Sequence, residues 1–439
     1  MARTTDPSAL PASFRLEAGR LSLDPSDPDF FQNPYPVYAA LIEASGTAWW
    51  DNIGGLAVAR HDLVSSILKD RRFGRIVPSD AAGRPDFSQK PDHLRAFYAL
   101  ESHSLLELEP PTHTRLRALL TKAFVSRRIE RLAPQIAAIA DQLIDEFADH
   151  ETVDLIAAYA SPLPVRVIAD LIGLPASASD HLLDWSHRMV AMYTPGRSLD
   201  AEHAANRAAE EFAAFLREIV EEKRKRPADD LISALIAAEI EGGKLDRDEL
   251  ISLVVLLLNA GHEATVHQIG NGVKTILEWS SHAGDAPASL FSTEPRAEAA
   301  VEETLRFDPP LHLFERYALV PVELPGGVTL ARGEKVALLL AAANRDPAAY
   351  ADPDVFIPRR FLDRSAKTVT SFGGGIHFCI GAPLARLELK IALERLFLRC
   401  PDLHLAATTS YRNSWHFHGL ETLQVMAGLV DRRPRHSPP

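Results

Sequence analysis

Residues 372–381 read FGGGIHFCIG and surround Cys379, one of two cysteines in the chain, with glycines and bulky apolar residues. The segment runs directly into a helix-like stretch, residues 382–399, so the thiol is expected at a helix N-terminus. Unpaired amides and the helix dipole favour a thiolate there by about 0.3–1 kcal/mol. Gly381 lets backbone approach the sulfur, and the two phenylalanines of the segment exclude water. A shielded thiolate of this kind suits a haem iron that splits O–O bonds.

The same ten residues match a known motif. Its fixed positions are Phe, Gly, any, Gly, any, His, any, Cys, any, Gly, and all six are filled. The segment therefore resembles the haem-binding signature of the cytochrome P450 family, which implies haem b (iron protoporphyrin IX) with Cys379 as its thiolate ligand. The alternative, a small buried cysteine beside a glycine turn, is the commoner state of a lone cysteine. In this region the resemblance assigns to the cofactor Phe372, Gly373, His377, Ile380, Gly381 and Ala385.

Composition is that of a globular protein, with 46% hydrophobic and 24% charged residues among 439. Two cysteines, Cys379 and Cys400, argue against a disulfide framework and favour a reducing cytoplasm. The charged, proline-containing N-terminus predicts neither a signal peptide nor a membrane anchor, and the strongest apolar run, residues 251–258, is too short to cross a bilayer. A formal net charge of −12 disfavours nucleic acid as a partner. We expect a soluble, cytoplasmic monomer.

Neither a linker nor an internal repeat divides the chain. The resemblance covers roughly residues 34–430 and implies one mainly α, triangular helical domain with small β-sheets over residues 1–439, with disordered tails at about 1–20 and 432–439. Apolar periodicity predicts helices over residues 62–69, 111–124, 129–147, 201–226, 246–279 and 294–306. Short β-rich pieces lie at 56–59, 317–330 and 420–426. Two long segments, 74–109 and 344–375, have no assignment, and stretches of that length usually carry function.

A second constellation suits the carboxylates of the cofactor. His113 and Arg117 lie four residues apart on a helix that follows two prolines, so they share one face. The alternative is an ordinary exposed basic face. The resemblance identifies this helix as the one that binds the haem propionates, and it adds Arg316 and His377 as further partners. A buried dianionic edge needs several such donors, because unpaired charge is costly in a low dielectric.

A third motif concerns the support of the Cys379 loop. Glu303 and Arg306 match the Glu-x-x-Arg helix motif of the family, although acid–base pairs at this spacing are common on helices. By position, Arg360 completes a Glu303–Arg306–Arg360 network that fixes the segment before the thiolate. The resemblance thus gives these three residues a structural role.

Residues 259–265 read NAGHEAT and follow a stretch that is apolar all round, which indicates a buried helix. The resemblance identifies it as the oxygen-binding helix, with Ala260 and Gly261 at the cofactor, Gly261 leaving a gap for a diatomic ligand, and Glu263 as the acid that delivers protons. A zinc-protease His-Glu-x-x-His site is excluded, because residue 266 is Val and the histidine at i+5 is rotated by about 140°.

The position after this acid departs from the family pattern. A threonine hydroxyl is usual there, whereas this chain has Ala264, with Thr265 one residue later and about 100° further round the helix. Three explanations compete: the substrate or an ordered water supplies the hydroxyl, Thr265 reaches in through a local bulge, or dioxygen use couples poorly to product formation. We favour the first. Catalytic roles in this region are assigned to Glu263, Ala264 and Thr265.

The resemblance implies a monooxygenase that inserts one oxygen atom from O2 into a hydrophobic small molecule. No flavin or iron–sulfur motif is present, so electrons are expected from a separate ferredoxin and ferredoxin reductase. Basic docking candidates are Arg115, Lys122, Arg386 and Lys390. The alternatives are a peroxygenase, in which Arg typically replaces Glu263, a haem-thiolate dehydratase or isomerase, and a non-catalytic haem-binding sensor or recruiting protein.

The substrate pocket is expected to be mostly apolar, which suits a terpenoid, aromatic or macrolide-like compound. Its histidine and asparagine could hold a few polar groups, although a histidine at a pocket edge is as often structural. The residues expected to line it are Leu105, Leu256, Asn259, His312, Phe314 and Phe417.

Overall fold

The computed structural model describes residues 9–124, 129–193, 196–240 and 245–428. The described helices are α1 (Pro28–Gln32), α2 (Tyr35–Ala44), α3 (His61–Lys69), α4 (Arg95–Glu101), α5 (Thr112–Ala123), α7 (Ala133–Phe147), α8 (Pro162–Ile172), α9 (Ser179–Val190), α10 (Leu199–Lys225), α11 (Leu231–Ile240), α12 (Arg247–Ala283), α13 (Glu294–Phe307), α14 (Leu340–Ala343) and α15 (Ala382–Arg399). They form the main body of the molecule, as the mainly α prediction requires.

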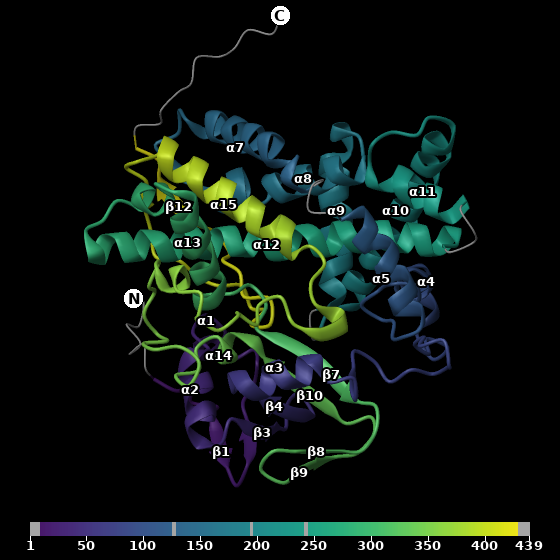
Figure 1. Ribbon diagram of the computed structural model, residues 1–439, viewed down its shortest axis with the longest axis horizontal. Coiled ribbons are helices and arrows are strands. Elements are labelled where there is room, and N and C mark those ends of the chain that lie inside the picture. The colour runs from purple at the N-terminus through teal and green to yellow at the C-terminus, as the bar shows by residue number, and fades with distance from the viewer. Residues whose placement is uncertain (1–8, 125–128, 194–195, 241–244, 429–439) are drawn as a thin grey trace, which may run out of the picture.

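The long helix α12 is the centre of this body (Figure 1). A capping box starts it: the Asp246 side chain accepts from the Glu249 amide at 2.8 Å, and the Glu249 side chain accepts from the Asp246 amide at 3.1 Å. Helices α8, α9, α10, α13 and α15 pack around it. Because neighbours surround it, most of its side chains are buried, which matches the all-round apolar pattern of the sequence.

Three sheets complete the fold. The largest has the order β1-β2-β3-β4-β10-β7-β5, and the smaller ones have the orders β11-β12-β6 and β8-β9. The large sheet lies on the opposite side of α12 from α7 and α15 (Figure 1). The strands are β1 (Arg15–Glu17), β2 (Arg20–Ser22), β3 (Thr47–Trp50), β4 (Gly55–Val58), β5 (Phe73–Gly74), β6 (Thr152–Asp154), β7 (Leu313–Ala318), β8 (Val322–Leu324), β9 (Val328–Leu330), β10 (Lys335–Leu339), β11 (His404–Leu405) and β12 (Gln424–Met426).

Every helix that periodicity predicts is present, with ends displaced by a few residues. Two expectations need correction. Residues 15–22 are not a disordered tail, because β1 pairs with β2 and β2 pairs with β3; the other expected tail, 432–439, lies outside the described residues. The segment 74–109 is not structureless either, since it contains a 3-10 turn (Asp92–Leu94) and α4.

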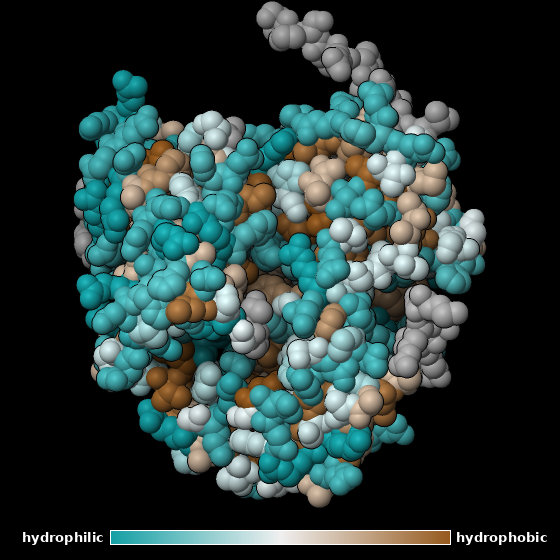
Figure 2. Space-filling model, turned by 180° about the vertical axis from the view of Figure 1, so that it is seen from behind, coloured by the Kyte–Doolittle hydropathy of each residue, from teal (hydrophilic) through white to brown (hydrophobic). Residues whose placement is uncertain are grey.

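Helix α12 is also the most apolar long element. By length and composition it is long and apolar enough to cross a membrane, with a mean hydropathy of 1.4 in its most apolar window, although 72% of that window is buried inside the molecule. A buried core helix of a soluble protein passes the same test, so the finding is weak evidence for a membrane span. Figure 2 shows a face covered mainly by hydrophilic residues, with hydrophobic ones in small patches.

Candidate functional site

Cys379 lies at the end of a tight loop that leads into α15. Its amide donates to the Phe372 carbonyl at 3.0 Å, which closes the loop. Gly375 has a φ of +66° and approaches the Leu68 backbone so closely that a Cβ would collide with it, which explains the glycine of the motif. Of the two phenylalanines, Phe372 is buried but Phe378 is 37% exposed. Only the first therefore shields the thiol as expected.

Burial and electrostatics act in opposite directions on the thiol. Burial raises the pKa of Cys379, while the amides of Gly381 and Ala382 and the charges of Arg117 and Arg386 lower it, and the net direction is upward. The amides at the helix N-terminus favour the thiolate as expected, but desolvation is the larger effect. A bound metal ion reverses this balance, because a coordinating thiol is deprotonated outright.

A buried cluster of ionisable groups lies beside the Cys379 loop. The Glu109 carboxylate accepts from His377 Nε2 at 3.1 Å, and the rings of His113 and His377 lie 4.3 Å apart between centroids. Arg316 is buried and donates to the Glu315 carbonyl at 2.9 Å. The structure thus brings together three of the four residues expected to hold the propionates: His113, Arg316 and His377. The Glu109 carboxylate, which was not expected there, lies beside them.

Burial makes the charged forms of this cluster costly. Burial and the neighbouring Arg75 lower the pKa of Arg316 to about 9, although Glu109 opposes them. Burial and the His377 charge lower the pKa of His113 to about 4. Within the described residues, Nδ1 of His113 is buried without a hydrogen-bond partner. Because the His113 ring is neutral, the buried guanidinium of Arg316 is the group of this cluster that favours an anion.

The fourth expected residue, Arg117, points to the loop itself. Its guanidinium donates to the Phe378 carbonyl, next to Cys379. His113 and Arg117 therefore share a helix face as predicted, but one contacts the carboxylate cluster and the other the cysteine loop.

Glu303, Arg306 and Arg360 form the network expected from their spacing. Arg306 donates to both carboxylate oxygens of Glu303, at 2.7 and 2.8 Å, and Arg360 donates to the same carboxylate at 3.1 and 3.2 Å. Arg306 also donates to backbone carbonyls of the segment 344–375, at Asn344, Pro353 and Val355. The network thus fixes the long irregular segment onto α13.

Asn344 extends this support to the cysteine loop. Its side-chain amide donates to Ser371 Oγ at 2.8 Å, and its Oδ1 accepts from the Thr370 amide at 2.8 Å. Ser371 Oγ in turn donates to the Leu305 carbonyl at 2.6 Å. The residues just before Phe372 are therefore held by α13, so the position of Cys379 depends on the buried Glu303 network.

On α12, the small residues differ in what they face. Ala260 is exposed although it lies in the middle of a buried helix, so open space adjoins it. At Gly261 a Cβ would lie 3.1 Å from Ile168 Cγ1 of α8, so the glycine allows two helices to pack closely. Ala260 is thus the residue that fits a cofactor face.

Glu263 lies within a ring of basic side chains. Its Oε1 lies 3.2 Å from His267 Nε2 and 3.9 Å from Arg412 Nη1, and its Oε2 lies 3.4 Å from His262 Nε2 and 3.6 Å from His187 Nε2. Burial by itself would raise the pKa of Glu263, but the His267 hydrogen bond and the neighbouring histidines outweigh it and lower the pKa. The carboxylate is therefore ionised and suited to accept a proton.

The two residues after this acid offer no free hydroxyl. Ala264 has none, and Thr265 Oγ1 donates to the Gly261 carbonyl at 3.3 Å. α12 is continuous through this region, without a bulge that would turn Thr265. Of the three explanations for the departure at Ala264, the structure gives no support to the one that invokes Thr265.

The expected pocket residues divide into two groups. Leu105, Leu256, Phe314 and Phe417 are buried or half-buried, and Asn259 donates to Met189 Sδ at 3.7 Å. His312 lies elsewhere: it is fully buried and its Nδ1 is 2.9 Å from the Tyr38 hydroxyl. This corrects its assignment as a substrate contact, because the side chain has no exposed surface and packs within the core.

A cavity of about 270 Å³ opens beside α4. Its lining comes from the segment 74–109, for which the sequence indicated a function but no structure, and from the region after α9. None of the six expected pocket residues belongs to it. The lining residues are Phe87, Lys90, Phe97, Tyr98, Glu101, Glu107, Met192, Tyr193 and Arg197.

Most of the expected docking cations are already paired. Arg115 donates to Glu249 at 3.0 Å, Arg386 to Glu302 at 2.7 Å, and Lys390 to Glu294 at 2.7 Å. Lys122 is exposed. An acidic partner would therefore compete with internal carboxylates at three of the four positions.

Sequence reasoning missed several residues of the site. Arg75 and Glu101 lie in the segment that had no assignment, and His187 and Arg412 reach Glu263 from other parts of the chain. No local spacing links these residues to their partners, so only the folded chain brings them together.

Three comparisons with known proteins identify relatives of this chain. A family model described as cytochrome P450 matches residues 293–410. Cytochrome P450 107B1 of Saccharopolyspora erythraea is 40% identical over 385 residues, which are 84% of this chain and 89% of that protein. The 6-deoxyerythronolide B hydroxylase of the same organism is 35% identical over 404 residues, covering 89% and 95%.

Solved structures agree. P450BioI, in its complex with hexadec-9Z-enoic acid ligated acyl carrier protein, matches with a TM-score of 0.81 at 33% identity, over 91% of this chain and 99% of that chain. The family implies a haem-thiolate cofactor. The chain belongs to the cytochrome P450 family, as the resemblance predicted, and it is an oxidoreductase enzyme.

Proposed function

We propose that Cys379 ligates haem b in this chain and that the enzyme inserts one oxygen atom from O2 into a hydrophobic small molecule. The observation that carries the proposal is the partly exposed Cys379 side chain beside a cluster that holds the buried Arg316 guanidinium and the unpartnered Nδ1 of His113. A haem-thiolate group presents one thiol-binding metal and one dianionic edge. The metal suits the cysteine, and the dianionic edge suits the cluster.

Several observations support this fit. The orphaned Nδ1 of His113 and the buried guanidinium of Arg316 are groups that a propionate would satisfy. His377 would complete the carboxylate side, and Arg117 would hold the cysteine loop through the Phe378 carbonyl. Exposed Ala260 gives a small surface for the opposite face of the ring. Ile380, Gly381 and Ala385 are partly exposed around Cys379, which leaves room for a flat group.

When bound, haem supplies dioxygen activation, which a thiolate ligand promotes. The chain supplies the proton path and the shielding. Glu263 is ionised and accepts and passes on protons at its carboxylate. Ala264 places no hydroxyl next to this path, and the Thr265 hydroxyl is engaged by Gly261. The substrate or an ordered water therefore supplies the missing donor.

We propose an extended, mostly apolar substrate of the polyketide or fatty-acyl type. One relative is named for the hydroxylation of 6-deoxyerythronolide B, and one solved neighbour holds an acyl chain on a carrier protein. The apolar residues Leu105, Leu256, Phe314 and Phe417 agree with such a substrate. A panel of these compounds, read by the shift of the haem Soret band, tests the class; a response only to small polar compounds contradicts it.

The ligand assignment has a direct test, because the chain has two cysteines. The reduced carbon monoxide complex of the wild type is expected to show the red-shifted Soret band of thiolate ligation. Cys379→Ser removes that band, while Cys400→Ala, a change at a buried cysteine elsewhere, retains it. Retention of the band by the Cys379 variant would overturn the proposal.

Electrons are proposed to come from a cytoplasmic ferredoxin and its reductase. Exposed Lys122 and the paired Arg115, Arg386 and Lys390 form the docking side. Ion pairing at an exposed surface weakens with salt, so the rate of reduction by an acidic ferredoxin falls as ionic strength rises. A rate that does not depend on salt contradicts this docking side.

A further inference from the structure

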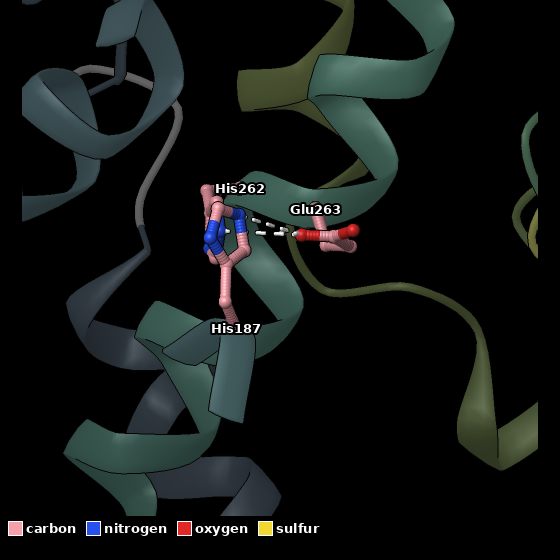
Figure 3. A group of neighbouring side chains, drawn as sticks. All are labelled: His187, His262 and Glu263. Carbon is pink, nitrogen blue, oxygen red and sulfur yellow. Dashed lines mark ion pairs between the residues drawn. The ribbon is translucent and has the colours of Figure 1, made fainter. Parts of the chain in front are cut away.

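Three side chains from two helices direct one atom each toward a common point. They are His187 of α9, and His262 and Glu263 of α12 (Figure 3), and one ligand atom from each lies within 4.8 Å of the other two. Glu263 Oε2 is 3.6 Å from His187 Nε2 and 3.4 Å from His262 Nε2. His187 is 48% exposed at its side chain and His262 is fully buried, so the point is reachable from solvent on one side only.

The hydrogen bonds of His262 determine which of its nitrogens is free. Its Nδ1 lies 3.1 Å from the Leu258 carbonyl and 3.4 Å from the Ser186 hydroxyl. The carbonyl is the nearer atom and can only accept, so we assign the proton to Nδ1. In the neutral ring, Nε2 then presents a lone pair to the Glu263 carboxylate. Within the described residues, neither Nε2 of His262 nor Oε2 of Glu263 has a hydrogen-bond partner. Two buried acceptors that face each other at 3.4 Å repel unless a cation lies between them.

The rest of the cluster orients these ligand atoms. His267 Nε2 approaches the other Glu263 oxygen, Oε1, at 3.2 Å, which fixes the carboxylate and leaves Oε2 directed at the two imidazoles. An imidazole that donates its other N–H to a carbonyl, and a ligating carboxylate that accepts a hydrogen bond, are the usual supports of a metal site.

We propose that His187, His262 and Glu263 bind a divalent transition-metal ion, with Zn²⁺ as the best match. Bonds of about 2.0–2.2 Å in a tetrahedral site separate neighbouring ligand atoms by roughly 3.3–3.6 Å. The two distances to Glu263 Oε2, 3.4 and 3.6 Å, agree with this separation. Two imidazoles and one carboxylate suit Zn²⁺ better than Mg²⁺ or Ca²⁺, which prefer oxygen ligands.

This site does not depend on a local motif. Val266 removes the His-Glu-x-x-His pattern, and His187 supplies the second imidazole from another helix. The consequence for function rests on the proposed monooxygenase activity: an ion on Glu263 Oε2 blocks the carboxylate that passes protons. The metal therefore acts as an inhibitor of turnover and not as a cofactor of the reaction.

The binding test uses tag-free holoenzyme and Zn²⁺ alone. Isothermal titration calorimetry and metal analysis after gel filtration are expected to give one ion per chain. His187→Ala removes an exposed ligand and lowers the affinity by at least about tenfold, whereas His181→Ala, at another exposed position of α9, changes it by less than about twofold. Absence of stoichiometric binding, or equal binding by wild type and His187→Ala, overturns the site.

A second measurement separates this proposal from the proposed function. Product formation is followed against Zn²⁺ concentration, and each protein is normalised to its own metal-free rate. Inhibition is expected in the wild type and in His181→Ala, with its midpoint raised by at least about tenfold in His187→Ala. An enzyme that binds Zn²⁺ as described but oxidises no substrate refutes the proposed function and retains the site. An active enzyme that binds no Zn²⁺ refutes the site alone.

Discussion

Glu303 and Arg306 form a bidentate pair at 2.7 and 2.8 Å, and neither side chain has exposed surface. The pair holds the backbone of the segment 344–375 through Arg306, and Arg360 adds a further bond to the same carboxylate. Removal of one member leaves buried charge without a partner, which costs about 3–5 kcal/mol. The Glu303–Arg306 pair is therefore required to hold Cys379 in its position.

We predict that Glu303→Ala loses haem or fails to fold, and does not merely turn over more slowly. Holoprotein yield and thermal unfolding measure this. The matched control is Glu298→Ala, an exposed carboxylate on the same helix, which should behave as the wild type. A stable, haem-loaded Glu303→Ala protein contradicts the structural role.

Ala264→Thr is expected to leave folding intact and to change the ratio of product formed to peroxide released. Ala264 is only half-buried, so an added hydroxyl and methyl group find space. The readouts are product and hydrogen peroxide per reducing equivalent, measured with the same substrate. An unchanged ratio would show that the substrate or an ordered water does not replace the missing hydroxyl.

Arg316→Gln should weaken haem retention while making the haem-free protein more stable. The guanidinium is buried, and burial and Arg75 lower its pKa to about 9, so the charge is costly until an anion joins it. Haem transfer to an acceptor protein and unfolding of both forms measure the two effects. Arg332→Gln, an exposed control, should change neither. If the haem-free variant is less stable than the haem-free wild type, the buried Arg316 charge does not destabilise the haem-free protein.

Glu101 is expected to make the folded protein less stable as pH rises. Burial, followed by the Glu107 charge, raises its pKa to about 8, well above the usual range of a carboxyl group. At a pH below the pKa of Glu101 in both the folded and the unfolded chain, this carboxyl group is protonated in both states. Between the two pKa values the unfolded chain loses the proton while the folded chain keeps it, so stability falls by about 1.4 kcal/mol per pH unit, and the loss is complete above the folded value.

Glu101→Gln removes this dependence. Its melting temperature should exceed that of the wild type at pH 8 and approach it near pH 4.5, and Glu298→Gln controls for charge alone. If the difference between wild type and Glu101→Gln does not change with pH, Glu101 is not the neutral carboxyl inferred here.

The sequence by itself determined the family and those parts of the candidate site whose residues are close together in one helix or loop. The motif around Cys379, the pairs His113–Arg117 and Glu303–Arg306, and the long apolar α12 are all local patterns. Each follows from helix geometry or from a fixed loop, which a linear sequence records. The long helices were predicted for the same reason, and their ends moved by a few residues because caps and packing decide them.

The tertiary structure decided what depends on groups from distant segments. Gly261 serves helix packing because Ile168 of α8 lies against it, and His312 is a core residue because Tyr38 approaches it. The Cys379 thiol has a raised pKa because burial outweighs the helix amides. His187 meets Glu263 only where α9 crosses α12. Desolvation and such contacts arise from folding, so no pattern in the sequence contains them.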